Sequence, residues 1–344
     1  MPGEETKIAV IGAGAIGGIT AAFMKKAGRE LEIVCRRQEL ADKISHPGVH
    51  VTGLKGEHRI RLTARKSISD LSGPMDIVFL ATKANDCESA AKELDPYLRP
   101  ESVVVSLQNG ICEHALGDIL GNERVIGCVV AWGASHNGPG ELEVTSEGEF
   151  VIGNIDHRPD DRLGPIKRLL DPVNPTRISD NIMGELYSKL IVNACLNSLG
   201  VIGGANLGRL LADKRARHIF IKIMEEAMAV AKAMEIRVEP AGGGKLDFYK
   251  FSDGRGFVAD LMRHLTIRVI GFKYRRIKSS SLQSIERGRR TEIDFLNGYI
   301  CDRGREFGVK TPVNDAVRKT VLEIEEGKRE MAPENFDRLA FDAA

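Results

Sequence analysis

Residues 7–17 read Lys-Ile-Ala-Val-Ile-Gly-Ala-Gly-Ala-Ile-Gly, and this stretch decides the fold of the first half of the chain. An apolar run leads directly into a GxGxxG pattern and then into a helical stretch, so we expect a strand, a tight turn and a helix. Gly12 permits the turn, Gly14 lets the backbone approach an anion, and Gly17 lets the helix pack on the strand. Free N–H groups at the helix start attract phosphate, so the pattern predicts a dinucleotide pyrophosphate site rather than merely a flexible turn. The predicted site comprises Gly12, Ala13, Gly14, Ala15, Ile16 and Gly17.

The rest of the first half alternates short apolar runs with helical stretches. This pattern is typical of parallel strands joined by crossover helices, and it predicts a doubly wound α/β sheet. We expect strands at residues 7–11, 31–35, 76–81, 102–107 and 125–131. Residues 49–63, between the second and third of these strands, predict a small antiparallel excursion.

The pattern changes near residue 180, after Pro159, Pro165, Pro172 and Pro175. Strand patterns cease there and long helical periodicities begin, so we expect a nearly all-α second domain. The predicted helices lie at residues 184–199, 217–234, 280–302 and 312–327. The predicted domains are 1–182, which binds the dinucleotide, and 183–344, which is helical and binds substrate.

The composition argues against several classes of protein. The 344 residues include 49 Lys and Arg against 48 Asp and Glu, so the formal charge of +1 offers no field to hold nucleic acid. Six cysteines stand far apart without a CxxC pair and eight histidines lack ligand spacing, which predicts reduced thiols and no metal site. The N-terminus lacks signal-peptide features, and no span approaches the ~20 apolar residues of a transmembrane helix. We expect a cytoplasmic protein with a small-molecule substrate and no nucleic-acid or membrane partner.

The end of the second predicted strand bears on the choice of cofactor. An acidic residue there would bind a ribose 2′-hydroxyl, but this chain has Cys35-Arg36-Arg37. Arg36 can present its planar fork to a 2′-phosphate, and Lys83, after the strand at 76–81, can add a second positive charge. These residues favour NADP(H) over NAD(H). The alternative is that Arg36 and Arg37 form a solvated turn.

Lys189, Asn193 and Asn197 stand at i, i+4 and i+8 of the first predicted helix of the second domain. They form a polar line on a helix whose other residues are mostly apolar. Burial disfavours the charged form of a lysine, so Lys189 in such a place can serve as a general acid near neutral pH, with the asparagines orienting a substrate. The alternative is a lysine that reaches solvent and two asparagines bonded to backbone.

Glu292 is the second candidate for chemistry. In the predicted helix 280–302 it shares a stripe with the apolar residues Ile285, Leu296 and Tyr299, so we expect a buried and paired carboxylate. Its partner is either a nearby arginine such as Arg289 or a group in the interdomain cleft, Lys189 or a substrate hydroxyl. The serines at the start of that helix are suitable N-caps.

Taken together, these motifs give the chain a resemblance to the ketopantoate reductase family (2-dehydropantoate 2-reductase). The family joins an N-terminal Rossmann domain to a helical domain similar to that of 6-phosphogluconate dehydrogenase. The likeness covers nearly the whole chain and rests on Gly12-Ala-Gly-Ala-Ile-Gly17, Thr82-Lys83, Gln108-Asn109-Gly110, Lys189-Leu-x-x-Asn193-x-x-x-Asn197, Ser279-Ser280 and Thr291-Glu292-Ile293-Asp294.

The resemblance implies roles for these residues. Lys189 matches the family's catalytic general acid, and Glu292 matches the acidic residue that binds the substrate hydroxyl and assists catalysis. The matching substrate-binding positions are Asn109, Asn193, Asn197 and Ser280, and Asn109 is also a predicted cofactor-binding position. The implied reaction is reduction of 2-dehydropantoate to (R)-pantoate by NADPH, on the route to pantothenate and coenzyme A, and the implied assembly is a homodimer.

The sequence also departs from the family pattern. Residues 238–278 are longer than their counterpart, with Gly242-Gly243-Gly244 and a basic run at 273–278, and they either line the substrate cleft or elaborate the surface. A 2-oxo acid other than ketopantoate therefore stays open as the substrate. A non-catalytic sensor of NADP(H) is a third possibility, although a sensor has no need of Lys189 and Glu292.

Overall fold

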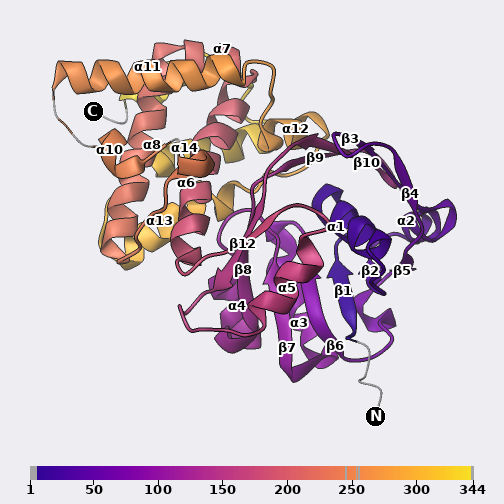
Figure 1. The fold of residues 1–344 in the computed structure, drawn as a ribbon. Helices are drawn as coiled ribbons and strands as arrows, with labels where there is room; N and C mark the ends of the chain where they lie inside the picture. Colours follow the sequence, from indigo (N-terminus) through magenta and orange to yellow (C-terminus); the bar gives the residue numbers. More distant parts are fainter. Residues whose placement is uncertain (1–5, 245, 253, 255, 342–344) are drawn as a thin grey trace. The chain divides into compact units, whose positions relative to one another are not determined.

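The computed structural model describes residues 6–244, 246–252, 254 and 256–341. It divides into two compact units, Met1–Ile182 and Met183–Ala344 (Figure 1). The first unit is a mixed α/β body and the second is helical, so the predicted fold class is confirmed.

The first unit is built on an eight-stranded sheet in the order β12-β11-β8-β7-β6-β1-β2-β5. Its strands are β1 (Ile8–Ile11), β2 (Glu32–Val34), β5 (Thr63–Arg65), β6 (Met75–Leu80), β7 (Leu98–Ser106), β8 (Val125–Val130), β11 (Phe150–Asn154) and β12 (Thr176–Ile178). The six strands from β5 to β8 are parallel, whereas β11 pairs antiparallel with β8. All five predicted strands are present, and β5, β11 and β12 are additional.

Strand β1 is the starting point of two outward paths. One path leads through β2 to β5, and the other leads from β6 through β7 to β8 on the opposite side of β1. The direction in which successive strands are added to the sheet therefore reverses between β1 and β6. In open α/β sheets, ligands bind beyond the carboxyl ends of the strands at such a reversal.

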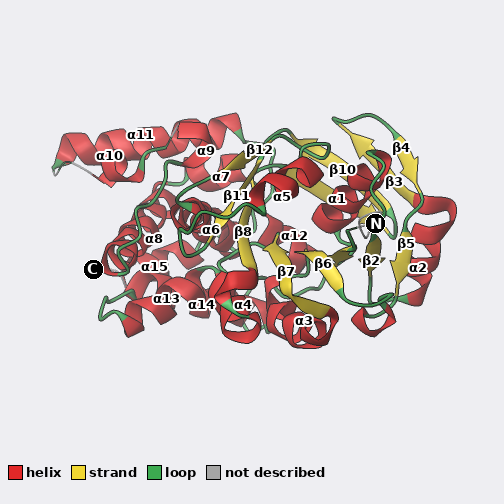
Figure 2. Ribbon diagram, turned by 60° about the horizontal axis from the view of Figure 1, so that its bottom comes forward, coloured by secondary structure: helices red, strands yellow, loops and turns green. Residues whose placement is uncertain are grey.

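Helices cover both faces of this sheet. The α-helices of the unit are α1 (Ala15–Lys26), α2 (Gln38–Lys43), α3 (Cys87–Leu94), α4 (Glu113–Leu120) and α5 (Leu163–Leu170). Figure 2 shows α1 and α5 on one face and α3 and α4 on the other, as a doubly wound sheet requires. Short turns of helix complete the unit: η1 (Ile44–Gly48), η2 (Ile68–Asp70), η3 (Ala84–Asp86), η4 (Asp95–Tyr97) and η5 (Asn122–Arg124).

A second sheet of four strands lies against α1. It comprises β3 (Val49–Gly53), β4 (His58–Ile60), β9 (Gly133–Gly138) and β10 (Glu141–Ser146), in the order β4-β3-β10-β9. The antiparallel pair β3–β4 is the predicted excursion. Its parallel pairing with β10 was not predicted. A Cβ on Gly18 of α1 would lie 2.5 Å from the Leu142 side chain of β10, so a glycine is needed where the helix meets this sheet.

The regular structure in the described residues of the second unit is helical, apart from one isolated bridge between Ala241 and Leu246. Its helices are α6 (Ile182–Gly203), α7 (Leu207–Ala212), α8 (Lys214–Ala233), α9 (Ala241–Gly244), α10 (Phe248–Ser252), α11 (Phe257–Lys273), α12 (Ser280–Glu286), η6 (Ile293–Phe295), α13 (Asn297–Glu306), α14 (Pro312–Glu325) and α15 (Asn335–Phe341). Helix α8 contacts α7, α11, α13, α14 and α15. The Tyr187 hydroxyl of α6 donates to the Ala227 carbonyl of α8, which ties the two longest helices together.

Helix α6 corrects one expectation. By length and composition, it is the one helix of the described chain that is apolar enough to cross a membrane, with 22 residues and a mean hydropathy of 1.2. The expectation that no segment reaches this threshold is therefore wrong. Because 78% of the apolar 18-residue stretch of α6 is buried in the structure, α6 has the character of a core helix.

The single helix predicted at 280–302 is also wrong, because α12 ends at Glu286. The Arg289 N–H donates to the Ser284 carbonyl and the Gly288 N–H donates to the Ile285 carbonyl, while Gly288 has a φ of 64°. These are the bonds of a Schellman motif, in which glycine takes the left-handed conformation and stops the helix. Glu292 thus lies in the segment before η6 and does not share a helical stripe with Ile285.

Candidate functional site

The glycine turn follows β1 as predicted, and packing explains two of its glycines. Gly12 has a φ of 112°, and a Cβ there would lie 2.7 Å from the Ala81 carbonyl oxygen. A Cβ on Gly17 would lie 2.0 Å from the Gly12 carbonyl oxygen, closer than any real contact. Only glycine therefore fits at either position without a shift of the backbone.

Gly14 differs from both neighbours in the motif. Its φ of −74° suits any residue, and a Cβ there would meet no described atom within 4 Å. Gly14 is exposed at the N-terminus of α1, which no side chain of the described residues caps. The turn therefore leaves open space in front of free N–H groups, and such a place accepts an anion.

Ala13, Ala15 and Ile16 complete the turn. All three are partly buried, and Ala13 and Ile16 pack against the hydrophobic core of the first unit. The side chains of Ala13 and Ile16 thus anchor the turn on the hydrophobic core.

The predicted cofactor residues follow four neighbouring strands of the sheet. Arg36 follows β2, the glycine turn follows β1, Lys83 follows β6 and Asn109 follows β7, and these strands stand in the order β2, β1, β6, β7. The four strands are parallel, so all four segments emerge at the same carboxyl edge. The structure therefore brings the predicted cofactor residues to one edge, at the reversal of strand order.

Arg36 has a partner that sequence reasoning missed. Its guanidinium lies 3.0 Å from a carboxylate oxygen of Asp86, at the end of η3. The Arg36 side chain is 68% exposed, and such exposed ion pairs contribute little to stability. The pair instead holds the guanidinium beside the edge of the sheet, where a phosphate can compete with Asp86 for it.

Gln108 is the second residue that was not singled out as a candidate. Its buried side-chain amide donates to the Thr82 hydroxyl at 2.9 Å and to the Lys83 carbonyl at 3.4 Å. It therefore ties the loop after β6 to the loop that carries Asn109. Its sequence signal was a polar residue directly after a buried strand.

In the second unit, the predicted polar line lies along α6. Lys189 and Asn193 are half-buried on the least buried side of the helix, whereas Asn197 is buried. In the described part of the chain, the Asn193 side chain makes no intramolecular hydrogen bond. Its amide is therefore available to a ligand.

Asn197 and Ser280 meet directly. The Ser280 hydroxyl donates to Oδ1 of Asn197 at 3.3 Å, which joins α6 to the first turn of α12. A Cβ on Gly200 would lie 2.4 Å from the Ser279 hydroxyl, so this glycine allows the close approach. The Ser279 hydroxyl accepts from the Leu282 N–H, which confirms the cap predicted there.

Glu292 is buried, at 8% exposure, as predicted, although it is not helical. The neighbouring Thr291 donates its backbone N–H to Glu325 of α14 at 2.8 Å, and its hydroxyl accepts from the Ile293 N–H. These bonds hold the Glu292 segment in place without a helix. The prediction that either Arg289 or a catalytic group pairs with Glu292 stays a prediction.

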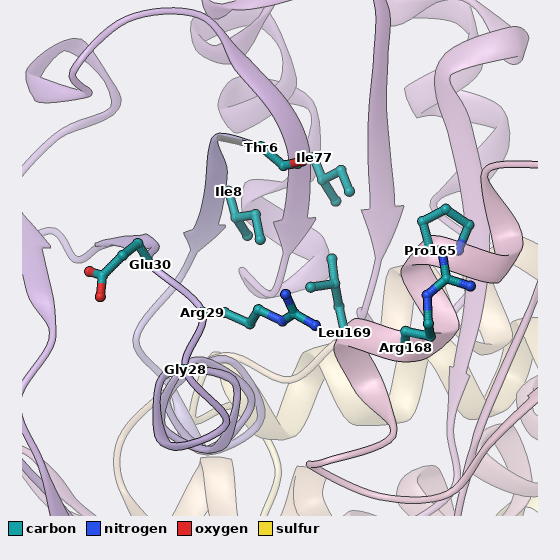
Figure 3. Close-up of a pocket in the computed structure, with 9 residues that line it drawn as sticks. All are labelled: Thr6, Ile8, Gly28, Arg29, Glu30, Ile77, Pro165, Arg168 and Leu169. Atoms are coloured by element: carbon teal, nitrogen blue, oxygen red, sulfur yellow. The ribbon is translucent and has the colours of Figure 1, made fainter. Parts of the chain in front are cut away.

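Two cavities lie away from these residues. One, of about 270 Å³, lies at the amino end of β1 and β6, opposite the glycine turn, and Arg29 and Arg168 line it (Figure 3). The other, of about 780 Å³, lies beside α8 and α10 of the second unit and is lined by Lys232 and Tyr249, among others. Neither contains a predicted site residue. Within the described residues, no three His, Cys, Asp or Glu side chains are grouped to hold a metal ion.

Comparison with known proteins gives a consistent result along the chain. The model of the family "Ketopantoate reductase PanE/ApbA" matches residues 8–157, and the model of its C-terminal domain matches residues 181–325. The 2-dehydropantoate 2-reductase of Aquifex aeolicus is 27% identical over 319 residues, which cover 92% of this chain and 96% of that protein.

Solved structures have the same fold. A PanE/ApbA family ketopantoate reductase from Ralstonia eutropha superimposes with a TM-score of 0.80 and 28% identity, covering 94% of this chain and 99% of that one. A D-mandelate dehydrogenase solved with NADH and anilino(oxo)acetate has a TM-score of 0.78 at 24% identity, covering 94% and 99%, and shares the fold. The chain therefore belongs to the ketopantoate reductase family of dinucleotide-binding oxidoreductases.

Proposed function

We propose that the protein uses NADPH to reduce 2-dehydropantoate to (R)-pantoate, with Lys189 as the proton donor. One observation carries the proposal: both units match the family, over residues 8–157 and 181–325, and each contains half of the required chemistry. The first unit has an open glycine turn that suits a phosphate, and the second has Lys189, Asn193, Asn197 and Ser280 on two joined helices.

The residues of the first unit fit a phosphorylated dinucleotide. The space in front of Gly14 and the uncapped N–H groups of α1 suit a pyrophosphate. No acid follows β2, and Arg36 offers two N–H groups to a 2′-phosphate with Lys83 as a second cation. When bound, the reduced nicotinamide supplies a hydride.

The second unit supplies the groups that act on the substrate. Lys189 donates a proton to the oxygen of the 2-oxo group as negative charge develops on it, which lowers the barrier. Glu292 accepts a hydrogen bond from a substrate hydroxyl. Asn193 and the Asn197–Ser280 pair bind and orient the substrate, and Asn109 of the first unit adds a further amide.

A second candidate is the reduction of another 2-oxo acid by the same chemistry. The observation that favours it is the long segment 238–278, which forms α9, α10 and α11. The fold alone does not decide the substrate, since a D-mandelate dehydrogenase shares it.

The test is a substrate panel. Purified protein is mixed with NADPH or NADH and with 2-oxo acids bearing hydroxylated, branched aliphatic or aromatic side chains, and nucleotide oxidation is followed by absorbance. We expect the highest kcat/KM with NADPH and 2-dehydropantoate. A higher kcat/KM, by orders of magnitude, for another member of the panel favours the second candidate. Nucleotide binding with no turnover of any member favours a sensor.

A further inference from the structure

The cavity at the amino end of β1 and β6 is lined by apolar side chains and by two arginines. Ile8 and Ile77, which are paired across the two strands, are buried and line it together with Leu169 of α5. Its volume of about 270 Å³ equals that of about nine water molecules at ~30 Å³ each. Pockets for drug-sized ligands reach about 300–1,000 Å³, so this cavity suits a smaller molecule.

Arg29 is held at the cavity by the turn that ends α1. The Arg29 N–H donates to the Met24 carbonyl at 3.1 Å, and the Gly28 N–H donates to the Lys25 carbonyl at 2.9 Å, which are the bonds of a Schellman motif. Gly28 has a φ of 82°, and a Cβ there would meet no described atom within 4 Å. The backbone of Arg29 is therefore fixed beside open space. From this turn the Arg29 side chain reaches toward α5 (Figure 3).

Arg168 reaches the same cavity from the last turn of α5. Its Nη1 lies 3.7 Å from the place of a Cβ on Gly164, so the side chain runs back along the helix by one turn. Figure 3 shows it beside Pro165. Ile166 and Leu169 anchor α5 on the hydrophobic core of the first unit. Both arginines therefore line one cavity from elements that packing holds in place.

No neighbouring acid neutralises the two guanidinium groups. Within the part of the chain that the structure describes, neither Arg29 nor Arg168 makes a hydrogen bond or an ion pair. Glu30 is the one carboxylate among the described residues that line the cavity, and its two oxygens accept from Lys25 at 2.5 and 2.6 Å. The cavity therefore has two like charges without a counter-charge, and such a place favours an anion.

The two charges favour a phosphate over a carboxylate. A phosphomonoester carries a charge of about −1.5 to −2 near pH 7 and has three acceptor oxygens, so one group can bond to both guanidinium forks. A single carboxylate has one charge and two oxygens, and it matches one fork. The apolar lining lowers the local dielectric constant, which strengthens hydrogen bonds to a charged group.

We propose that this cavity binds a small phosphomonoester, with Arg29 and Arg168 donating to the same phosphate group. The site is separate from the edge that we assign to the cofactor. Strand β1 has four residues, so it spans about 13 Å between the cavity and the glycine turn at ~3.3 Å per residue. Phosphate and dinucleotide can therefore be bound at the same time. This inference is independent of the proposed reaction.

The first experiment is a calorimetric titration of the full-length protein with inorganic phosphate at low ionic strength. We expect a Kd of about 1 mM or lower. Arg29→Gln and Arg168→Gln should each raise this Kd at least about 10-fold, because each loses a charge-assisted hydrogen bond. The matched control is Arg36→Gln, which removes the same charge at the carboxyl edge of the sheet and should leave the Kd unchanged. Absence of binding, or binding that survives either Arg29→Gln or Arg168→Gln, overturns the proposal.

Two controls separate this site from the glycine turn and from a loss of folding. The titration is repeated with saturating NADP⁺, and the Kd for phosphate should not change. A Kd that rises with the NADP⁺ concentration assigns the phosphate to the glycine turn and overturns the proposal. Arg29 and Arg168 are exposed, so both variants should unfold, without phosphate, at the wild-type temperature or above it. Glu30→Gln removes the carboxylate from the lining and should lower the Kd by up to about 5-fold.

The last experiment identifies the class of anion. Glycerol 3-phosphate, inorganic phosphate and succinate are compared as ligands of the wild type. We expect glycerol 3-phosphate to bind at least as tightly as inorganic phosphate, because its carbon chain can contact the apolar lining, and succinate to bind at least about 10-fold more weakly. A lower Kd for inorganic phosphate than for glycerol 3-phosphate assigns the cavity to free phosphate, and a lower Kd for succinate assigns it to a dicarboxylate. Either result overturns the assignment to a phosphomonoester.

Discussion

Replacing Gly14 by alanine separates cofactor binding from stability. A Cβ at Gly14 meets no described atom within 4 Å, and its φ of −74° is ordinary for alanine. The free protein should therefore be within about 1 kcal/mol of the wild type in stability, because the loss of chain entropy in the unfolded state offsets the replacement of glycine by alanine at the N-cap of α1. The same methyl group occupies the space in front of α1 that we assign to the pyrophosphate.

The loss in binding follows from the contacts that the methyl group prevents. If it displaces the pyrophosphate from one charge-assisted N–H bond, the cost is about 1.5–3 kcal/mol. The Kd for NADPH should then rise about 10- to 150-fold. Calorimetric titration with NADPH measures this change, and thermal unfolding without nucleotide measures stability.

Gly17→Ala is the matched contrast within the motif. Its Cβ would lie 2.0 Å from the Gly12 carbonyl oxygen, so this variant should unfold at a lower temperature than the wild type even without nucleotide. A Gly14→Ala variant that binds NADPH as tightly as the wild type would refute the assignment of the turn to the pyrophosphate.

Further predictions concern Arg36 with its ion-pair partner Asp86, Lys189, and His50. Arg36→Asp should raise the KM for NADPH about 10- to 100-fold and change the KM for NADH far less, because only NADPH loses a bidentate phosphate contact. Equal effects on the KM values of the two nucleotides in steady-state assays would remove the NADP(H) assignment. Asp86→Asn frees Arg36 from its ion pair and should lower the KM for NADPH. Lys189→Met should lower kcat by about 10²- to 10⁴-fold while NADPH binding is retained, and full activity would exclude a proton-donor role. Hydrogen bonds that protonated His50 donates to the carboxylates of Glu141 and Glu57 raise the pKa of His50. These bonds should therefore stabilise the protein at pH values below the ordinary histidine pKa and lose their effect as the pH rises through the raised pKa, so unfolding temperatures across that range should fall more for the wild type than for His50→Gln.

The cofactor half of the fold was predictable because its determinants are local. A strand, a glycine turn and a helix occupy consecutive residues, and the strands after them show the same apolar pattern. The second sheet was not predictable in this way. Its parallel pairing joins His50 of β3 to Glu141 of β10. The sequence of neither strand indicates that it pairs with the other. The Arg36–Asp86 pair likewise depends on two loops that meet only when β2, β1 and β6 assemble.

The second unit shows a different limit. The polar line on α6 follows from helical spacing, and its contact with Ser280 depends on the close approach that Gly200 permits. The end of the helix after Glu286 was not predicted, although glycine, which stands at position 288, is the residue type that most often ends a helix. Helical periodicity predicted that Glu292 is buried, but for the wrong reason, because Glu292 does not lie in a helix. It is buried because the Thr291–Glu325 bonds hold its segment, and those bonds join residues 34 positions apart. The catalytic roles themselves stay predictions.

The most direct test of the account is a crystal structure of the wild-type protein with NADP⁺ and pantoate. We expect the pyrophosphate in front of Gly14, the 2′-phosphate on Arg36, and Nζ of Lys189 within about 3 Å of the 2-hydroxyl oxygen of the product. A complex in which Lys189 lies in bulk solvent, away from the bound hydroxyl, would contradict the proposed mechanism.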